Sequence, residues 1–101
     1  MTWRLLLDKK RAQNYYDHLP DKSRAIVRDH LLRLSDDPYP GSGADKEQLT
    51  IRGDNRYYRL HIGRSLTAFY TIHEEEGTVH ILEIMTIEQA HKKYGRIGNH
   101  R

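Results

Sequence analysis

The sequence predicts an α+β domain in which an N-terminal strand and a helical hairpin pack on a mainly antiparallel sheet of four to five strands, with a short C-terminal helix. The first half of the chain has apolar residues at helical spacing, whereas the second half alternates polar and apolar residues between turn sequences. The chain has 101 residues, and 37% of them are hydrophobic. A single domain over residues 1–101 is therefore expected to fold on its own.

The helical half begins with an apolar run at residues 3–7, which is typical of a strand and ends at an aspartate able to cap a helix. A first helix is expected over residues 9–19, because Pro20 stops it. A second helix is expected over residues 21–35, where isoleucine, valine and leucine recur on one face. Residues 36–47 hold two prolines and two glycines and no periodic apolar residue, which predicts a loop.

The second half predicts a meander of strands joined by tight turns. The strands are expected over residues 48–52, 57–62, 66–73 and 78–85, and the turns at 53–55, 63–65 and 74–77. A short final helix is expected after Thr86, because Thr86 and Gln89 have the spacing of a capping box, and Gly95 is expected to end it. Residues 95–101 are then expected to form a flexible basic tail.

Positive charge is concentrated in two segments, although the formal net charge is only +3. Residues 52–64 carry four arginines and one aspartate, and residues 91–101 carry four basic residues and no acid. Such clusters favour a polyanionic partner, and the alternative is a basic surface that serves solubility alone. The residues expected to contact nucleic acid are Arg56, Arg64, Lys92, Lys93 and Arg96.

The composition argues against several classes of protein. The chain has no cysteine, which removes disulfide frameworks and cysteine nucleophiles and fits a cytoplasmic location. Its longest apolar run is three leucines, against the roughly 20 residues of a membrane span, so no membrane partner is expected. The seven histidines are scattered and no glycine-rich phosphate loop is present, so neither a metal nor a cofactor is expected.

Arg59 and His61 lie two residues apart on one expected strand, so both point away from the helices together with Tyr57. Their separation of about 7 Å spans a phosphate group. A guanidinium can bind two phosphate oxygens, and an imidazole can take or give a proton near neutral pH. Because RNA carries its own nucleophile in the 2′-hydroxyl, such a pair could support metal-independent RNA cleavage; the alternative is a plain polar row on a half-exposed strand.

His91 and Tyr94 are three residues apart on the expected final helix and so share one of its faces. They could supply an acid, a base, or a ring on which an unpaired nucleotide base stacks. The alternative interpretation is a surface histidine and a packing tyrosine. With Arg59 and His61 they form the set of candidate catalytic residues.

The order of strand, helical hairpin, proline-marked loop and basic strands resembles the RelE/ParE superfamily of toxins from prokaryotic toxin–antitoxin systems, over about residues 3–94. The most specific part is the strand sequence YRLHIG at residues 58–63, followed by the strand LTAFYTI at residues 66–72. The resemblance implies a microbial-RNase-like fold. For the RelE branch, which we favour, it implies an endoribonuclease that cuts messenger RNA in the ribosomal A site by 2′-hydroxyl attack.

The resemblance also implies roles for particular residues. Arg59 and His61 match the strand positions at which the RelE branch places basic catalytic residues, and Tyr94 matches its C-terminal tyrosine. His91 lies where some members keep a histidine. The implied partners are an acidic antitoxin, the ribosome and mRNA, together with a toxin–antitoxin hetero-oligomer that binds operator DNA.

Two cations common in the RelE branch are replaced in this chain. Thr67 stands where an arginine is usual, and Thr86 or Ile87 stands where another basic residue is usual. Arg64 and Lys93 could substitute if they reach the same phosphate. The ParE branch shares the fold, lacks the nuclease residues and acts on DNA gyrase, so the two losses favour that alternative or a catalytically silent nucleic-acid-binding module.

Overall fold

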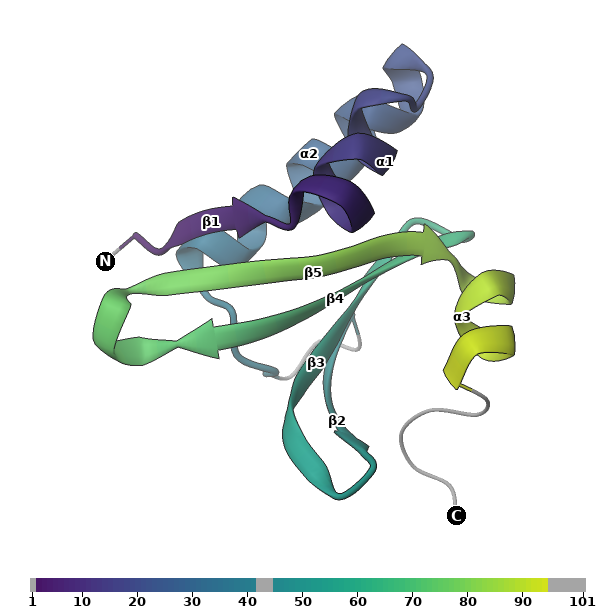
Figure 1. The fold of residues 1–101 in the computed structure, drawn as a ribbon. Helices are drawn as coiled ribbons and strands as arrows, with labels where there is room; N and C mark the ends of the chain where they lie inside the picture. Colours follow the sequence, from purple (N-terminus) through teal and green to yellow (C-terminus); the bar gives the residue numbers. More distant parts are fainter. Residues whose placement is uncertain (1, 42–44, 95–101) are drawn as a thin grey trace.

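The computed structural model describes residues 2–41 and 45–94, which form a mixed sheet of five strands with helices on both faces (Figure 1). The strand order is β1-β5-β4-β3-β2. β1 (Arg4–Leu7) runs parallel to β5 (Thr78–Thr86), and all other neighbours are antiparallel. The remaining strands are β2 (Lys46–Ile51), β3 (Asp54–Ile62) and β4 (Leu66–His73). The predicted α+β fold with a mainly antiparallel sheet is confirmed.

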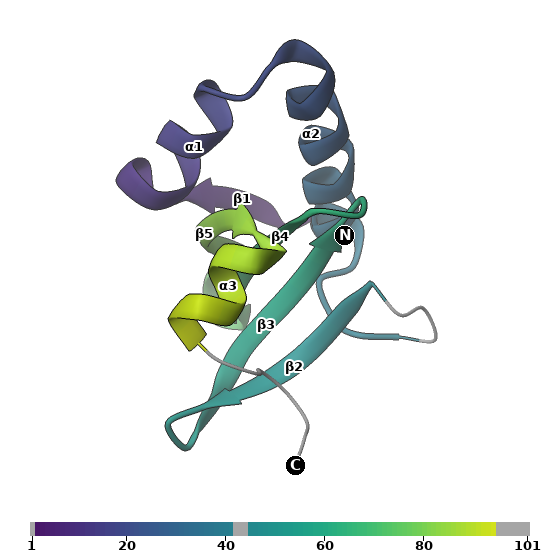
Figure 2. The ribbon, with the colours of Figure 1, turned by 90° about the vertical axis from the view of Figure 1, so that its right-hand side faces the viewer.

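Two helical segments form a hairpin on one face of the sheet, and they lie side by side in both views (Figures 1 and 2). The first consists of a π-type turn, η1 (Lys9–Gln13), continued by one α-helical turn, α1 (Asn14–Asp17). The second is α2 (Asp21–Asp36). Within the described part of the chain, no helix is long and apolar enough to cross a membrane.

The uniform helix predicted over residues 9–19 is wrong in detail. Asp8 does cap the segment, because its carboxylate accepts a hydrogen bond from the Arg11 backbone N–H at 2.8 Å. The Asp8 carbonyl, however, accepts hydrogen bonds from the backbone N–H groups of both Ala12 and Gln13. A carbonyl shared between the fourth and fifth following residues widens the turn, which gives the π geometry.

The main core lies between the helical hairpin and the sheet. From α2 it receives Val27, Leu31 and Leu34, all buried. Each such side chain stabilises the fold by about 1.5–3 kcal/mol, so the cluster fixes which sheet face turns toward the helices. Because side chains alternate along a strand, Arg59 and His61 lie on the opposite face, as predicted. The sheet contributes Leu60, Ile62, Ala68, Tyr70, Val79, Ile81 and Ile84.

The sheet edge formed by β2 begins earlier than the sequence predicts. The strand starts at Lys46, within the loop that was expected over residues 36–47. Lys46 and Glu47 pair with Leu60 and Arg59 of β3, and this pairing extends the backbone although neither side chain is apolar. Glu47 therefore belongs to the sheet and not to a loop.

The turn between β2 and β3 is also shorter than the one predicted at residues 53–55. Arg52 and Gly53 both have positive φ, of 54° and 82°, and form a two-residue hairpin connection. Such left-handed pairs match the twist of the flanking strands. Asp54 is therefore already part of β3.

The last described helix, α3 (Ile87–Tyr94), follows β5 directly and lies against the sheet face opposite to the helical hairpin (Figure 2). The predicted capping box is present: Gln89 N–H donates to Thr86 Oγ1 at 3.0 Å, and Thr86 N–H donates to Gln89 Oε1 at 3.1 Å. The predicted basic tail, residues 95–101, lies outside the described residues.

The sheet face that carries Arg59 and His61 is partly covered by α3. A second, smaller apolar cluster forms there because Ala90 of α3 packs among residues of three strands. Its buried members are Leu49, Phe69, Met85 and Ala90.

Candidate functional site

A row of four side chains crosses the sheet face that α3 partly covers. Glu47, Arg59, Phe69 and Glu83 occupy directly paired positions on β2, β3, β4 and β5. Neighbouring strands lie about 4.8 Å apart, so this central row spans about 14 Å. Each of its two ends is a carboxylate that binds two donor side chains.

At the β2 end, Glu47 binds both of the predicted strand residues. Its Oε2 accepts a hydrogen bond from Arg59 Nη2 at 2.6 Å and lies 3.2 Å from His61 Nε2. Partial burial pushes the pKa of Glu47 upward, but the hydrogen bonds from Arg59 and His61 outweigh it and hold this pKa below its ordinary value. These three residues, the Glu47 cluster, therefore present an ionised carboxylate at neutral pH.

Accessibility differs within the Glu47 cluster. The side chains of Glu47 and His61 are each 33% exposed, whereas that of Arg59 is only 12% exposed. A substrate can therefore reach the carboxylate and the imidazole directly. The guanidinium of Arg59 is much less accessible to it.

At the β5 end, Glu83 binds two residues of α3. Lys93 Nζ donates to Glu83 Oε2 at 2.7 Å, and the Tyr94 hydroxyl donates a hydrogen bond to Oε1. The Tyr94 ring packs on Phe69 with ring centroids 5.0 Å apart. Burial and the hydrogen bond to Glu83 raise the pKa of Tyr94 above its ordinary value, so the phenol stays protonated. Glu83, Lys93 and Tyr94 form the Glu83 cluster.

A cavity of about 760 Å³ lies beside the Glu83 cluster, lined by the β2–β3 hairpin, β4, β5 and α3. Arg59 and His61 do not line it, but Phe69, the cross-strand partner of Arg59, does. This aromatic cavity therefore adjoins the Glu47 cluster without containing it. Three rings, two cations and two carboxylates mix in its lining: Tyr57, Phe69, Tyr94, Arg52, Lys93, Asp54 and Glu83.

Three other predicted residues, His91, Lys92 and Arg64, do not join these clusters. His91 and Lys92 are exposed on α3, and no hydrogen bond or ion pair links either of them to another described side chain. Arg64 is exposed in the turn between β3 and β4. Arg96 lies outside the described residues.

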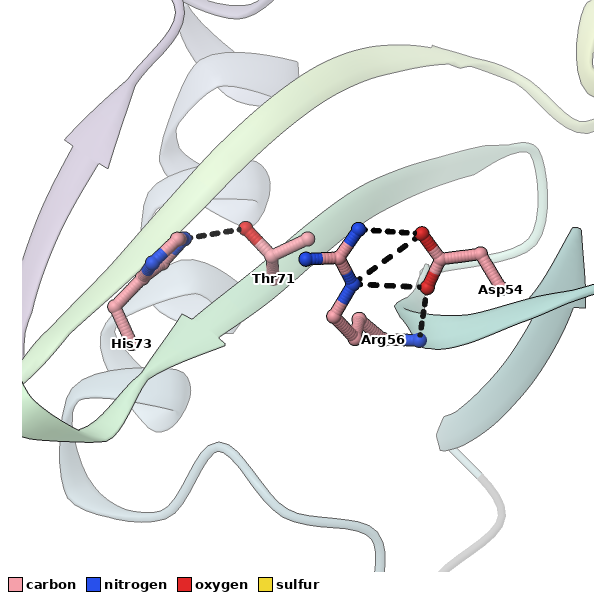
Figure 3. Close-up of polar contacts among 4 residues, drawn as sticks. All are labelled: Asp54, Arg56, Thr71 and His73. Atoms are coloured by element: carbon pink, nitrogen blue, oxygen red, sulfur yellow. Dashed lines mark hydrogen bonds and ion pairs between the residues drawn. The ribbon is translucent and has the colours of Figure 1, made fainter.

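Arg56 pairs with Asp54 two residues earlier on β3 (Figure 3). Its Nη2 lies 2.7 Å from Asp54 Oδ2, and its Nε lies 3.0 Å from Oδ1. The hydrogen bonds from Arg56 lower the pKa of Asp54 to about 2. The Arg56 side chain is 81% exposed, so the pair is weak and the guanidinium stays accessible to an anion.

Both positions at which the RelE branch usually has a cation serve packing or capping in this chain. Thr67 is 1% exposed, and its hydroxyl donates to the Leu60 carbonyl at 3.1 Å. Thr86 forms the capping box of α3. Among the described lysines and arginines, Arg59 alone pairs with Glu47.

The sequence did not point to Glu47 or Glu83. Glu47 fell in an expected loop, and only its pairing with Arg59 brings it to the site. Glu83 did offer a signal, because it is the single charge within the apolar sequence ILEIM and a buried acid requires a partner. Its face depends on a register shift between β4 and β5 at Phe69 and Tyr70, which alternation alone does not reveal.

No protein-family model matches the chain, and no curated protein matches it. Several solved structures do. The archaeal RelE–RelB complex from Pyrococcus horikoshii OT3 superposes with a TM-score of 0.67 at 22% identity, covering 85% of this chain and 96% of that one. The toxin–antitoxin complex RelBE2 from Mycobacterium tuberculosis gives 0.70 at 20% identity, covering 85% and 92%.

The isolated RelE toxin of E. coli gives a TM-score of 0.66 at 15% identity, covering 90% of this chain and 97% of that one. The likeness thus extends over nearly the full length of each relative while few residues are shared. It concerns the path of the backbone. This chain therefore has the fold of the RelE toxins.

Proposed function

We propose that this chain is the toxin of a toxin–antitoxin system and acts as a ribosome-dependent mRNA endoribonuclease. The Glu47 cluster is the observation that carries the proposal. It places a carboxylate, a guanidinium and an imidazole within hydrogen-bonding distance on an accessible part of the sheet. The RelE fold supports the same assignment, since the relatives it matches are named as toxins.

The three side chains match the needs of 2′-hydroxyl attack. Glu47 accepts the proton of the 2′-hydroxyl, whose oxygen then bonds to phosphorus. Arg59 stabilises the negative charge that develops on the phosphate oxygens. His61 gives a proton to the 5′-oxygen as its bond to phosphorus breaks, which leaves a 2′,3′-cyclic phosphate. This reaction uses no metal ion.

The aromatic cavity suits the nucleotides beside the cut. Tyr57, Phe69 and Tyr94 offer ring faces on which unpaired bases stack, a contact worth about 1–3 kcal/mol per base. The hydroxyl of Tyr94 donates its proton to Glu83, which holds the Tyr94 ring in the lining of the cavity. We therefore assign Tyr94 to substrate positioning, and we expect His91, which is exposed on α3, to contribute less.

Charge pairing supports the dependence on the ribosome. Arg56, Arg59 and Lys93 each bind a carboxylate in the free protein, so an RNA phosphate must compete with Asp54, Glu47 and Glu83. Affinity for free RNA is therefore low, because phosphate contacts supply most of it. A ribosome that presents the mRNA overcomes this competition by holding the strand in place.

The test is brief induction in a bacterial host, followed by a transcript-wide map of RNA ends. The parent chain is expected to arrest growth and to cut only ribosome-bound transcripts, and Arg59→Ala and His61→Ala are expected to lose both effects. Arg28→Ala and His30→Ala, which change an exposed and a half-buried residue of α2, serve as matched controls. Full growth arrest by the Arg59→Ala/His61→Ala double variant would contradict the nuclease assignment.

A second candidate is a non-nuclease toxin that acts on DNA gyrase. The burial of Arg59 and the structural use of Thr67 and Thr86 favour it. In that case the same induction yields DNA cleavage complexes and an SOS response while mRNA stays intact. A catalytically silent binding module would arrest no growth and would only bind nucleic acid in a salt-dependent way.

The partner that we propose is an antitoxin, because three large apolar side chains are exposed near the helical hairpin and the β1 edge. Leu6 is 47%, Ile26 41% and Leu32 53% exposed. β1 is an edge strand, so its outer backbone groups can pair with an added strand. Co-expression with the product of the adjacent gene is expected to relieve growth arrest, and Leu32→Glu is expected to prevent that relief. The complex is the form that would bind operator DNA.

A further inference from the structure

We propose that His73, Glu76 and His80 bind a divalent transition-metal ion, with Zn²⁺ as the best match, at the hairpin that joins β4 and β5. The sequence predicts no metal site, because these three residues lie on either side of a turn and match no ligand-spacing motif. His73 ends β4, Glu76 ends the short 3₁₀ turn η2 (Glu74–Glu76), and His80 lies within β5.

The three side chains converge closely enough to share one ion. Each offers a ligand atom, and these atoms all lie within 4.8 Å of one another. The rings of His73 and His80 lie face to face, with centroids 4.1 Å apart and planes inclined by 32°. His80 Nε2 is 4.0 Å from Glu76 Oε1.

The closure needed for coordination is small. Bonds of about 2.1 Å to a tetrahedral Zn²⁺ set ligand atoms about 3.4 Å apart, so the Glu76 to His80 gap of 4.0 Å must shrink by about 0.6 Å and no gap within the cluster by more than about 1.4 Å. The Glu76 side chain is 62% exposed on the turn, and it can move without disturbing the core.

A second observation comes from His80 itself. Its Nε2 atom is excluded from solvent and has no hydrogen-bond partner among the described residues. A buried polar atom left without a partner is unfavourable and calls for an explanation. A metal ion bound between the two imidazoles and Glu76 would use the lone pair of this nitrogen.

Thr71 gives the site an outer contact of the kind that metal-binding histidines have. Its Oγ1 is hydrogen-bonded to His73 Nε2 at 2.9 Å (Figure 3). Such a contact fixes the orientation of the ring and the nitrogen that carries its proton. His73 then presents its other nitrogen, Nδ1, as the ligand.

The donor set points to a borderline metal, and the position of the site in the fold points to a structural role. Two imidazoles and one carboxylate suit Zn²⁺ and leave a fourth position for water. Along β4, His73 lies six residues from Thr67, the strand partner of His61, which is about 20 Å. The ion would therefore hold the β4–β5 hairpin together without taking part in chemistry at the Glu47 cluster.

The experiment titrates the metal-free full chain with Zn²⁺ alone by calorimetry and with Co²⁺ by visible absorption. The parent chain is expected to bind one equivalent, with an absorption band typical of low-coordinate Co²⁺ and a higher Tm with Zn²⁺. Glu76→Gln and His80→Gln are each expected to weaken binding more than about 100-fold, since loss of a mere outer contact costs about 10–100-fold. His30→Gln, on α2, is expected to leave it unchanged.

Two results would overturn the proposal: no saturable binding by the parent chain, or binding that both variants retain. Glu76→Gln decides the matter if His80→Gln does not fold, because Glu76 is exposed. Neither substitution touches the Glu47 cluster, so both variants are expected to keep the RNA cleavage of the parent. Loss of metal binding and loss of toxicity are therefore separate outcomes.

Discussion

The two ends of the central row use the same chemistry in different surroundings. Glu47 and Glu83 are carboxylates that each bind one cation and one further donor. Glu83 is 7% exposed, and both of its partners come from α3, so it ties a helix to the sheet. Glu47 is one-third exposed, and its partners come from the neighbouring strand. Burial therefore assigns Glu83 to structure and leaves Glu47 available for chemistry.

The largest expected effect is on reaction rate at the accessible end. Glu47→Gln keeps the shape of the side chain and removes the base, so cleavage of ribosome-bound mRNA is expected to fall by about 10²–10⁴-fold. Glu75→Gln, on the exposed turn after β4, is the control and should leave the rate unchanged. A higher cleavage rate in Glu47→Gln would show instead that Glu47 only neutralises Arg59. Neither carboxylate of the central row would then take part in the reaction.

The next effect is on stability at the buried end. Glu83→Ala leaves Lys93 and Tyr94 without their partner and is expected to lower the free energy of unfolding by about 1–3 kcal/mol, measured with urea. Glu47→Ala is expected to lower it less, by about 1 kcal/mol or below, because that cluster is more exposed. Equal losses in the two variants would remove the distinction between the ends.

A smaller effect isolates the hydroxyl of Tyr94. Tyr94→Phe keeps the contact with the Phe69 ring and removes only the donor to Glu83, at an expected cost of about 1 kcal/mol. A double-mutant cycle with Glu83→Gln should show that the two losses are not additive. If they add in full, the hydroxyl and the carboxylate do not stabilise each other.

The smallest effect is a dependence of stability on pH at the Glu47 end. Since folding lowers the pKa of Glu47, its contribution is present above the ordinary value of 4.5 and is lost as the pH falls through the lower folded value. Free energies of unfolding from urea titrations are therefore expected to favour the parent over Glu47→Gln at pH 7, by up to about 1 kcal/mol, and this advantage is expected to shrink as the solution is made more acidic than pH 4.5. A constant difference would mean that the charge of Glu47 is irrelevant.

The sequence predicts the sheet face that carries the site because that prediction needs only local alternation. Leu60 and Ile62 point to the core, so Arg59 and His61 must point the other way. The capping box at Thr86 is local as well, and it too is confirmed.

Features that depend on distant pairing were not predictable in this way. Glu47 belongs to β2 because it pairs with Arg59, which lies twelve residues later in the sequence. The side on which Glu83 lies follows from a register shift between β4 and β5. Both carboxylates of the central row thus depend on contacts that no local pattern encodes, whereas the cation and the ring between them lie on strands that the sequence predicts.

The parallel pairing of β1 with β5 has a consequence for how the protein is made. Arg4 pairs with Thr78 and Leu7 with Ile81. β1 can therefore join the sheet only after β5 is available for pairing. Contacts between such distant segments form late and slowly. Since Glu83 is part of β5, the complete central row cannot form before β5 has been synthesised. A ribosome making this protein is therefore not exposed to the finished surface until synthesis has passed β5.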